Sequence, residues 1–184
     1  MKTFKTIFAA VLFLTVSNGM MAQTSDNANI TSNATVIQPI EVIAGESLEF
    51  GTVVAGVDKT INLLGVATAG DVTTVSGAAD TQAGSFIVSA AASSGVSLSF
   101  NFPENLVSGG NNLEIGDFAT GYLDAGDDLI EFATASAHGF SSFPAYTVDG
   151  VSGIKVLVGA TVKPLSDQAP GQYTGTISLT AEYN

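Results

Sequence analysis

The residue best suited to acid–base chemistry is the single histidine, His138, in the stretch ASAHGFSSF. A Ser-His-Asp arrangement would need a serine and a carboxylate around it, and both residue types are abundant in the chain. No serine, however, lies in the G-x-S-x-G pattern of a nucleophile elbow. The chain has no cysteine, which excludes thiol nucleophiles and cysteine-based zinc sites. We therefore interpret His138 as a solvated turn residue and predict that the protein is not an enzyme.

A cluster of carboxylates is the second candidate for chemistry. The stretch GDFATGYLDAGDDLIEFA holds five acidic residues within 15 positions: Asp117, Asp124, Asp127, Asp128 and Glu131. Oxygen-rich loops bind calcium, and paired carboxylates serve glycosidases. The spacing differs from that of a helix-loop-helix calcium loop, and the chain has no tryptophan to stack on a sugar. We favour a solvated turn before a short strand and expect no metal or cofactor, with Asp124, Asp127, Asp128 and Glu131 as the alternative calcium ligands.

The first 22 residues have the features of a secretory signal peptide. Lys2 and Lys5 precede the uncharged apolar run at residues 7–16, and the small residue Ala22 precedes a polar stretch. The apolar run is too short to span a bilayer stably, although an uncleaved membrane anchor is the alternative. We expect a mature chain from about residue 23 that is secreted or held at the cell surface after passing through the periplasm.

The charge balance excludes several classes of partner. Removal of Lys2 and Lys5 leaves three lysines against 17 acidic residues, a formal charge of −14, and the chain has no arginine. Because little positive charge is available to neutralise phosphates, we expect neither nucleic acid nor an anionic membrane surface as a partner. After cleavage of the signal peptide we expect no stable membrane span.

Short runs of alternating apolar and polar residues predict the elements that position these side chains. The clearest is VSLSFNF, and similar runs occur in SLEFG, TINLL, GSFIV and GIKVLVGATVK. Clusters of Gly, Asn, Asp and Pro separate them, as is typical of turns. The pattern predicts an all-β fold, an antiparallel immunoglobulin-like β-sandwich at residues 36–184, preceded by a signal-peptide helix and an extension at residues 23–35. Pro39 indicates an edge strand or a bulge.

The closing stretch PGQYTGTISLTAEYN predicts a strand at residues 172–183. Its odd positions carry Tyr173, Ile177, Leu179 and Tyr183, whereas polar residues occupy the even positions. Only the register that turns the odd positions inward buries the apolar set.

Two resemblances extend this prediction. The chain resembles a family of uncharacterised secreted bacterial β-sandwich domains, with L-x-F-G at residues 48–51, V-G-A-T at 158–161 and P-G-x-Y-x-G at 170–175. It more distantly resembles the cysteine-free subunits of chaperone–usher pili. Tyr183 is next to last and Gly171 is fourteenth from the end, as in those subunits. The stretches NITSNATVIQPIEV and APGQYTGTISL are similar to the start and the close of such pilins.

The pilin resemblance implies a sandwich that lacks its final strand. A periplasmic chaperone, and then the N-terminal extension of a like subunit, would fill the open edge. The donor residues would be Ala28, Ile30, Ala34 and Val36, and the acceptor groove would use Tyr173, Ile177, Leu179 and Tyr183. Alternatively, the first and last strands pair directly, and the protein is a self-contained secreted binding module for carbohydrate, protein or calcium.

Overall fold

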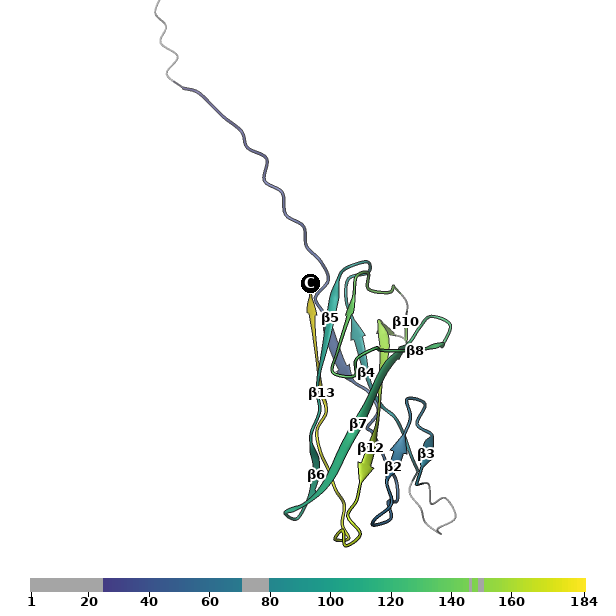
Figure 1. Ribbon diagram of the computed structural model, residues 1–184. Helices are drawn as coiled ribbons and strands as arrows, with labels where there is room; N and C mark the ends of the chain where they lie inside the picture. Colours follow the sequence, from purple (N-terminus) through teal and green to yellow (C-terminus); the bar gives the residue numbers. More distant parts are fainter. Residues whose placement is uncertain (1–24, 71–79, 146, 149–150) are drawn as a thin grey trace, which may run out of the picture. The chain divides into compact units, whose positions relative to one another are not determined.

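The computed structural model describes residues 25–70, 80–145, 147–148 and 151–184 (Figure 1). The predicted signal peptide lies outside these ranges. Residues 37–184 form one compact unit. All the regular elements within the described ranges are β-strands, and every paired strand is antiparallel. The predicted all-β antiparallel fold is therefore confirmed.

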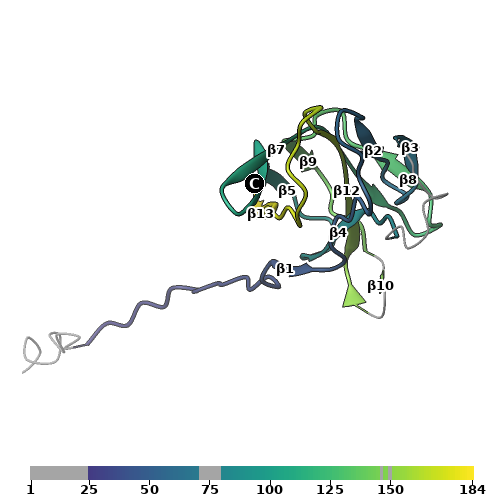
Figure 2. The same ribbon diagram turned by 90° about the horizontal axis from the view of Figure 1, so that it is seen from below.

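Two sheets make up the sandwich (Figures 1 and 2). The larger sheet contains β1 (Glu41–Ala44), β2 (Lys59–Ile61), β3 (Ala67–Ala69), β4 (Gly84–Ser89), β6 (Asn105–Ser108), β7 (Asn111–Leu123), β8 (Leu129–Glu131) and β12 (Ile154–Lys163). The smaller sheet has the order β13 (Ser178–Tyr183), β5 (Val96–Asn101), β9 (Ala137–Phe140). A separate hairpin joins β10 (Thr147–Val148) and β11 (Val151–Ser152).

The main core lies between the two sheets. In β5 the alternation is complete, with Val96, Leu98 and Phe100 buried and the residues between them exposed. These side chains pack against Val88 of β4 and Val156 of β12 from the larger sheet. The period of two in the sequence therefore corresponds to one buried face, as the alternation predicts. A second core cluster contains Phe50, Ile61, Leu113, Ile115, Ala160 and Val162.

Strand β12 departs from the prediction of one buried face. Its predicted inward residues, from Ile154 to Val162, are buried, but Leu157 and Thr161 on the other face are buried as well. β12 is the central strand of the larger sheet, where β4 and β2 pair along one edge and β7 along the other. The Thr161 hydroxyl lies 2.8 Å from that of Thr60 on β2.

The segment at residues 25–39 contains no strand. The predicted donor residues Ala28, Ile30, Ala34 and Val36 are all exposed. Pro39 precedes β1, which pairs only with β4 among the described strands, so the edge strand predicted from Pro39 is present. Ile40 and Val42 pack against the main core.

The last strand is shorter than predicted. β13 covers only residues 178–183, and before it a single bridge joins Thr174 to Val107 of β6. The ladder to β5 begins at the pair Ser178–Asn101, and Pro103, two residues beyond Asn101, has no N–H to extend it. Direct pairing of the first and last strands is not observed among the described residues, because β1 pairs with β4 and β13 with β5. Within the same residues, no helix is long and apolar enough to cross a membrane.

Candidate functional site

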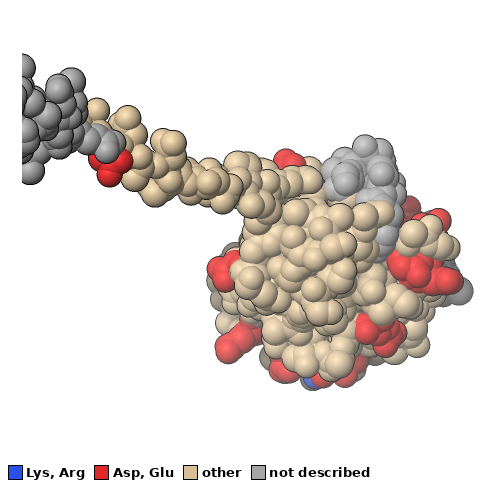
Figure 3. Space-filling view, turned by 90° about the horizontal axis from the view of Figure 1, so that it is seen from above, with Lys and Arg blue, Asp and Glu red and all other residues tan. Residues whose placement is uncertain are grey.

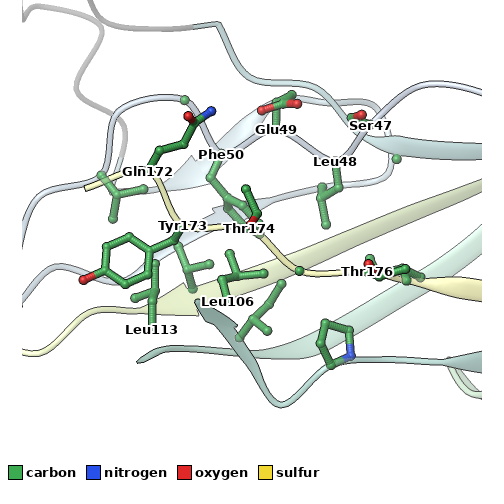
Figure 4. A pocket seen from close by; sticks show the side chains of 18 of the residues that line it. Ser47, Leu48, Glu49, Phe50, Leu106, Leu113, Gln172, Tyr173, Thr174 and Thr176 are labelled. Carbon is green, nitrogen blue, oxygen red and sulfur yellow. The ribbon is translucent and has the colours of Figure 1, made fainter. Parts of the chain in front are cut away.

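A groove of about 980 Å³ opens at the edge between the two sheets (Figure 4). Its first wall is the segment that follows β1, and its second wall is the segment that leads into β13. Its floor includes Leu106 of β6, Leu113 of β7 and Val162 of β12. The second core cluster supplies part of this floor, so an occupant of the groove would rest on apolar side chains.

The first wall presents main-chain groups to the groove. Glu49 exchanges two main-chain hydrogen bonds of 2.9 Å with Gln82, which lies on the side of the wall that faces away from the groove. In an antiparallel ladder the neighbouring residues then direct their N–H and C=O groups to the opposite edge, so those of Leu48 and Phe50 face the groove. The Phe50 side chain is buried and that of Leu48 is half-buried, whereas Glu49 is exposed. Figure 4 shows Leu48 and Phe50 on the side of the cavity.

The second wall has the same organisation. Thr174 exchanges main-chain hydrogen bonds of 2.8 and 3.1 Å with Val107, and the Asn184 N–H donates to the Gly95 carbonyl at 3.1 Å. Thr174 therefore bonds β6 and the even-numbered residues of β13 bond β5, so Tyr173 and the odd-numbered residues of β13 direct their main-chain groups toward the free edge. Among the described strands, none pairs with that edge.

The side chains of the second wall follow the predicted alternation. The half-buried ones are Tyr173, Ile177, Leu179, Ala181 and Tyr183, and the residues between them are exposed. Of the four predicted acceptor residues, Tyr173 and Ile177 line the groove. Leu179 and Tyr183 lie beyond it and pack against the main core.

Hydrogen bonds hold each wall in place. The Tyr173 hydroxyl donates to the Ala169 carbonyl at 2.7 Å and accepts from the Gln168 amide at 2.7 Å. The same amide donates to the Asn112 carbonyl at 3.0 Å. On the opposite wall, the ammonium of the buried Lys59 donates to the Thr52 carbonyl at 2.9 Å. Both walls are thus anchored to the sheets, so the groove is preformed.

On the side of β1 the groove lining ends at Ala44 and Ile177, and beyond them a contact bridges β13 and the segment before β1. There the Tyr183 hydroxyl donates to the Gln38 carbonyl at 2.6 Å and accepts from the Ala91 N–H at 2.8 Å. We call this the closed end. At the other end the lining includes Val53, Ala55 and Pro164, from the turns that follow the first wall and β12. We call this the mouth.

The three motifs that carry the family resemblance meet at this groove. Leu48 to Gly51 form part of the first wall, Val158 lies in the floor, and Pro170 to Gly175 form part of the second wall. Gly175 packs closely on the same floor, since a Cβ there would lie 2.7 Å from Cδ2 of Leu106. The sequence prediction of acceptor residues omitted Leu48 and Phe50, although the L-x-F-G motif contains both.

His138 is not the turn residue that we predicted. It lies in β9, opposite Leu98, and its ring stacks on Phe132 at a centroid distance of 3.9 Å and an interplanar angle of 11°. Partial burial lowers the pKa of His138 below its ordinary value. Within the described part of the chain, no hydrogen bond joins it to a hydroxyl or a carboxylate. Its surroundings are those of a packed aromatic residue.

The acidic cluster is divided among separate local roles. The Asp124 carboxylate accepts hydrogen bonds from the N–H groups of Gly126 (2.8 Å) and Asp128 (3.0 Å), which closes the turn before β8. Asp117 forms an ion pair of 2.8 Å with Lys163, and Glu131 lies in β8. Asp127 adopts a left-handed conformation in the same turn, with φ of 60°. In the residues that the structure covers, no group of three or more His, Asp or Glu side chains is placed to hold a metal.

Comparison with known proteins identifies a similarity to a protein family. A family model described as "Domain of unknown function (DUF4402)" matches residues 40–183, which is most of the chain. No curated protein and no solved structure matches the chain. The matched range begins next to β1 and includes β13, so it covers both walls of the groove.

Proposed function

The chain belongs to the DUF4402 family of domains of unknown function, and we propose that it is a secreted, non-enzymatic structural subunit that assembles by strand addition. The observation that carries this proposal is the preformed groove between two free sheet edges. Residues on both walls direct apolar side chains inward and main-chain N–H and C=O groups toward the same gap. A strand placed there would complete both sheets, with its alternate side chains resting on the floor.

The occupant we propose is the N-terminal extension of another copy, at residues 25–36. Its inward set would be Ala28, Ile30, Ala34 and Val36, all of which are exposed. As a strand, residues 28–36 would span about 27 Å, and the edge from Tyr173 to Tyr183 spans about 34 Å. The difference leaves room for the closed end at Tyr183. A periplasmic chaperone is the proposed occupant before assembly, since a free apolar edge favours aggregation.

A peptide-binding experiment tests the proposal. The mature chain is titrated with a fluorescent peptide of residues 25–36, and saturable binding is expected. Ile30→Asn in the peptide removes the largest inward side chain, whose burial contributes about 1.5–3 kcal/mol, so affinity should fall by tenfold or more. Thr31→Asn, on the outward face, is the matched control and should change affinity little. An excess of the peptide should also block association of the intact chain.

Substitutions in the first wall of the groove test the same contact. Leu48→Gln places an amide on the inner face of the first wall and should weaken peptide binding by about tenfold. Glu49→Gln, one residue along and exposed, should leave it unchanged. Equal binding of a scrambled peptide would exclude donor-strand recognition. A stable monomer that binds no peptide would favour the alternative of a self-contained binding module.

A further inference from the structure

Two neighbouring turns at the mouth of the groove carry exposed apolar side chains. Val54 and Val57 belong to one turn and are 42% and 45% exposed, and Leu165 on the other is 65% exposed. The turns are closed by the hydrogen bonds Val57 N–H to Val54 C=O (3.1 Å) and Gln168 N–H to Leu165 C=O (3.0 Å). We call these three side chains the mouth cluster.

Close packing holds these two turns together. Gly56 adopts φ of 76°, and a Cβ on it would lie 3.3 Å from Cα of Ser166. Both turns lie at the lower end of the sandwich in Figure 1, and Figure 2 shows them as neighbours from below. The mouth cluster therefore lies on two adjacent turns beside the groove.

The direction of the inserted strand follows from the two ends of the groove. At the closed end, Tyr183 is bonded to both Gln38 and Ala91, and β1 lies beside β13. At the mouth, the lining ends at the turns that contain Val53, Ala55 and Pro164. The inserted extension has to connect at Val36 to the body of its own subunit. This connection can leave at the mouth without breaking the Tyr183 contacts, so the strand would run antiparallel to β13.

The connection is too short to keep two subunits apart. Only residues 37–40 separate Val36 from Glu41, the first residue of β1, and five extended steps between Cα atoms reach about 18 Å at most. The body of the donor must therefore lie against the mouth of the acceptor. The first residue of the connection, Ile37, is apolar and 53% exposed in the single chain. It would leave the groove beside the mouth cluster.

Charge is compatible with this end-to-end contact. The chain has a net charge of −12, so two copies repel each other wherever their carboxylates meet. Figure 3 views the sandwich from the end that bears the start of β1. Its acidic side chains lie toward the periphery, and uncharged residues occupy the centre. This end would face the mouth of the next copy.

We propose that a second copy of the chain docks at the mouth cluster, with its Ile37 packed on Val54, Val57 and Leu165. This inference rests on the proposed function and adds to it a direction for the inserted strand and a second contact outside the groove. The contact exists only between whole subunits. A peptide of residues 25–36 ends before Ile37 and would not form it.

Because the chain has no cysteine, disulfide trapping can test the contact without competing disulfides from native cysteines. A variant with Ile37→Cys is mixed with one carrying Leu165→Cys at the mouth, or with one carrying Ala92→Cys near the closed end. The mixed disulfide is identified by mass. The expected product joins positions 37 and 165, and an excess of the 25–36 peptide suppresses it. A product that joins 37 and 92 instead would overturn the direction, while strand addition would stand.

An association measurement separates the two proposals. Leu165→Asn should weaken association of the intact chain by at least tenfold in sedimentation experiments at high salt, with affinity for the 25–36 peptide unchanged. Asp167→Asn, exposed in the same turn, is the matched control and should have little effect. If Leu165→Asn leaves association unchanged while the peptide still binds, the docking proposal is wrong and the proposed function stands. If neither peptide nor second copy binds, both are wrong.

Discussion

At the scale of single residues, His138 shows that packing determines the surroundings of a side chain, which its neighbours in the sequence do not predict. The sequence surrounds it with Gly and Ser, which favour a turn, but the chain places it in β9 between two phenylalanine rings. Its ring lies 3.9 Å from that of Phe132 and 4.8 Å from that of Phe140, measured between centroids. Partial burial in these surroundings disfavours the charged form of the imidazole relative to the neutral form.

This burial predicts a dependence of stability on pH. Because the pKa of His138 is lowered in the folded state, the unfolded chain binds the proton first as the pH falls. The free energy of unfolding should therefore decrease as the pH drops through the ordinary histidine pKa of about 6.5, with no such cost above it. His138→Phe should remove this slope between pH 7.5 and 5.5, measured by urea unfolding. The same slope in both proteins would show that other groups cause it.

At the scale of elements, β13 combines a packed face with a free edge. Its inward residues are half-buried against the main core, while its main chain pairs on one side only, with β5. The face contributes to the stability of the monomer, and the edge remains available for another strand. A substitution on the face should therefore affect folding more than one that points outward.

Adjacent residues of β13 provide a matched test. Leu179→Asp removes apolar contacts with the core and buries a carboxylate, so the free energy of unfolding should fall by about 2 kcal/mol or more. Thr180→Asp points outward, opposite Ser99, and should change stability by less than about 0.5 kcal/mol. Chemical denaturation of both variants measures the difference. Comparable losses in the two would contradict the register of this strand.

At the scale of the whole molecule, the acidic composition sets the conditions for assembly. Association of like-charged subunits through apolar surfaces should strengthen as salt screens their repulsion, because the Debye length falls from about 10 Å at 0.1 M to about 3 Å at 1 M. Sedimentation of the mature chain across this range should show a rising proportion of assembled protein. The 25–36 peptide carries only Asp26 and serves as a control, with a weaker salt dependence. Dissociation on adding salt would instead indicate an interface built on ion pairs.

Local sequence was sufficient to predict the strand class and the inward face of several strands. The side-chain period of a strand is two, so the alternation in VSLSFNF and in the closing stretch predicts which residues are inward without knowledge of any partner. The L-x-F-G, V-G-A-T and P-G-x-Y-x-G motifs carry the resemblance to the family and also lie in the sequence itself. Nothing in their spacing indicates that they meet, because the two groove walls are more than 100 residues apart in the chain.

Tertiary structure alone decided where the groove lies and what surrounds each candidate residue. The order of strands places β1 and β13 at neighbouring free edges, and only then do Leu48 and Tyr173 become opposite walls of one groove. It also buries residues on both faces of β12, the central strand of the larger sheet, and it packs His138 against Phe132. Contacts between distant segments depend on strand order, and an alternating pattern carries no information about which strands become neighbours.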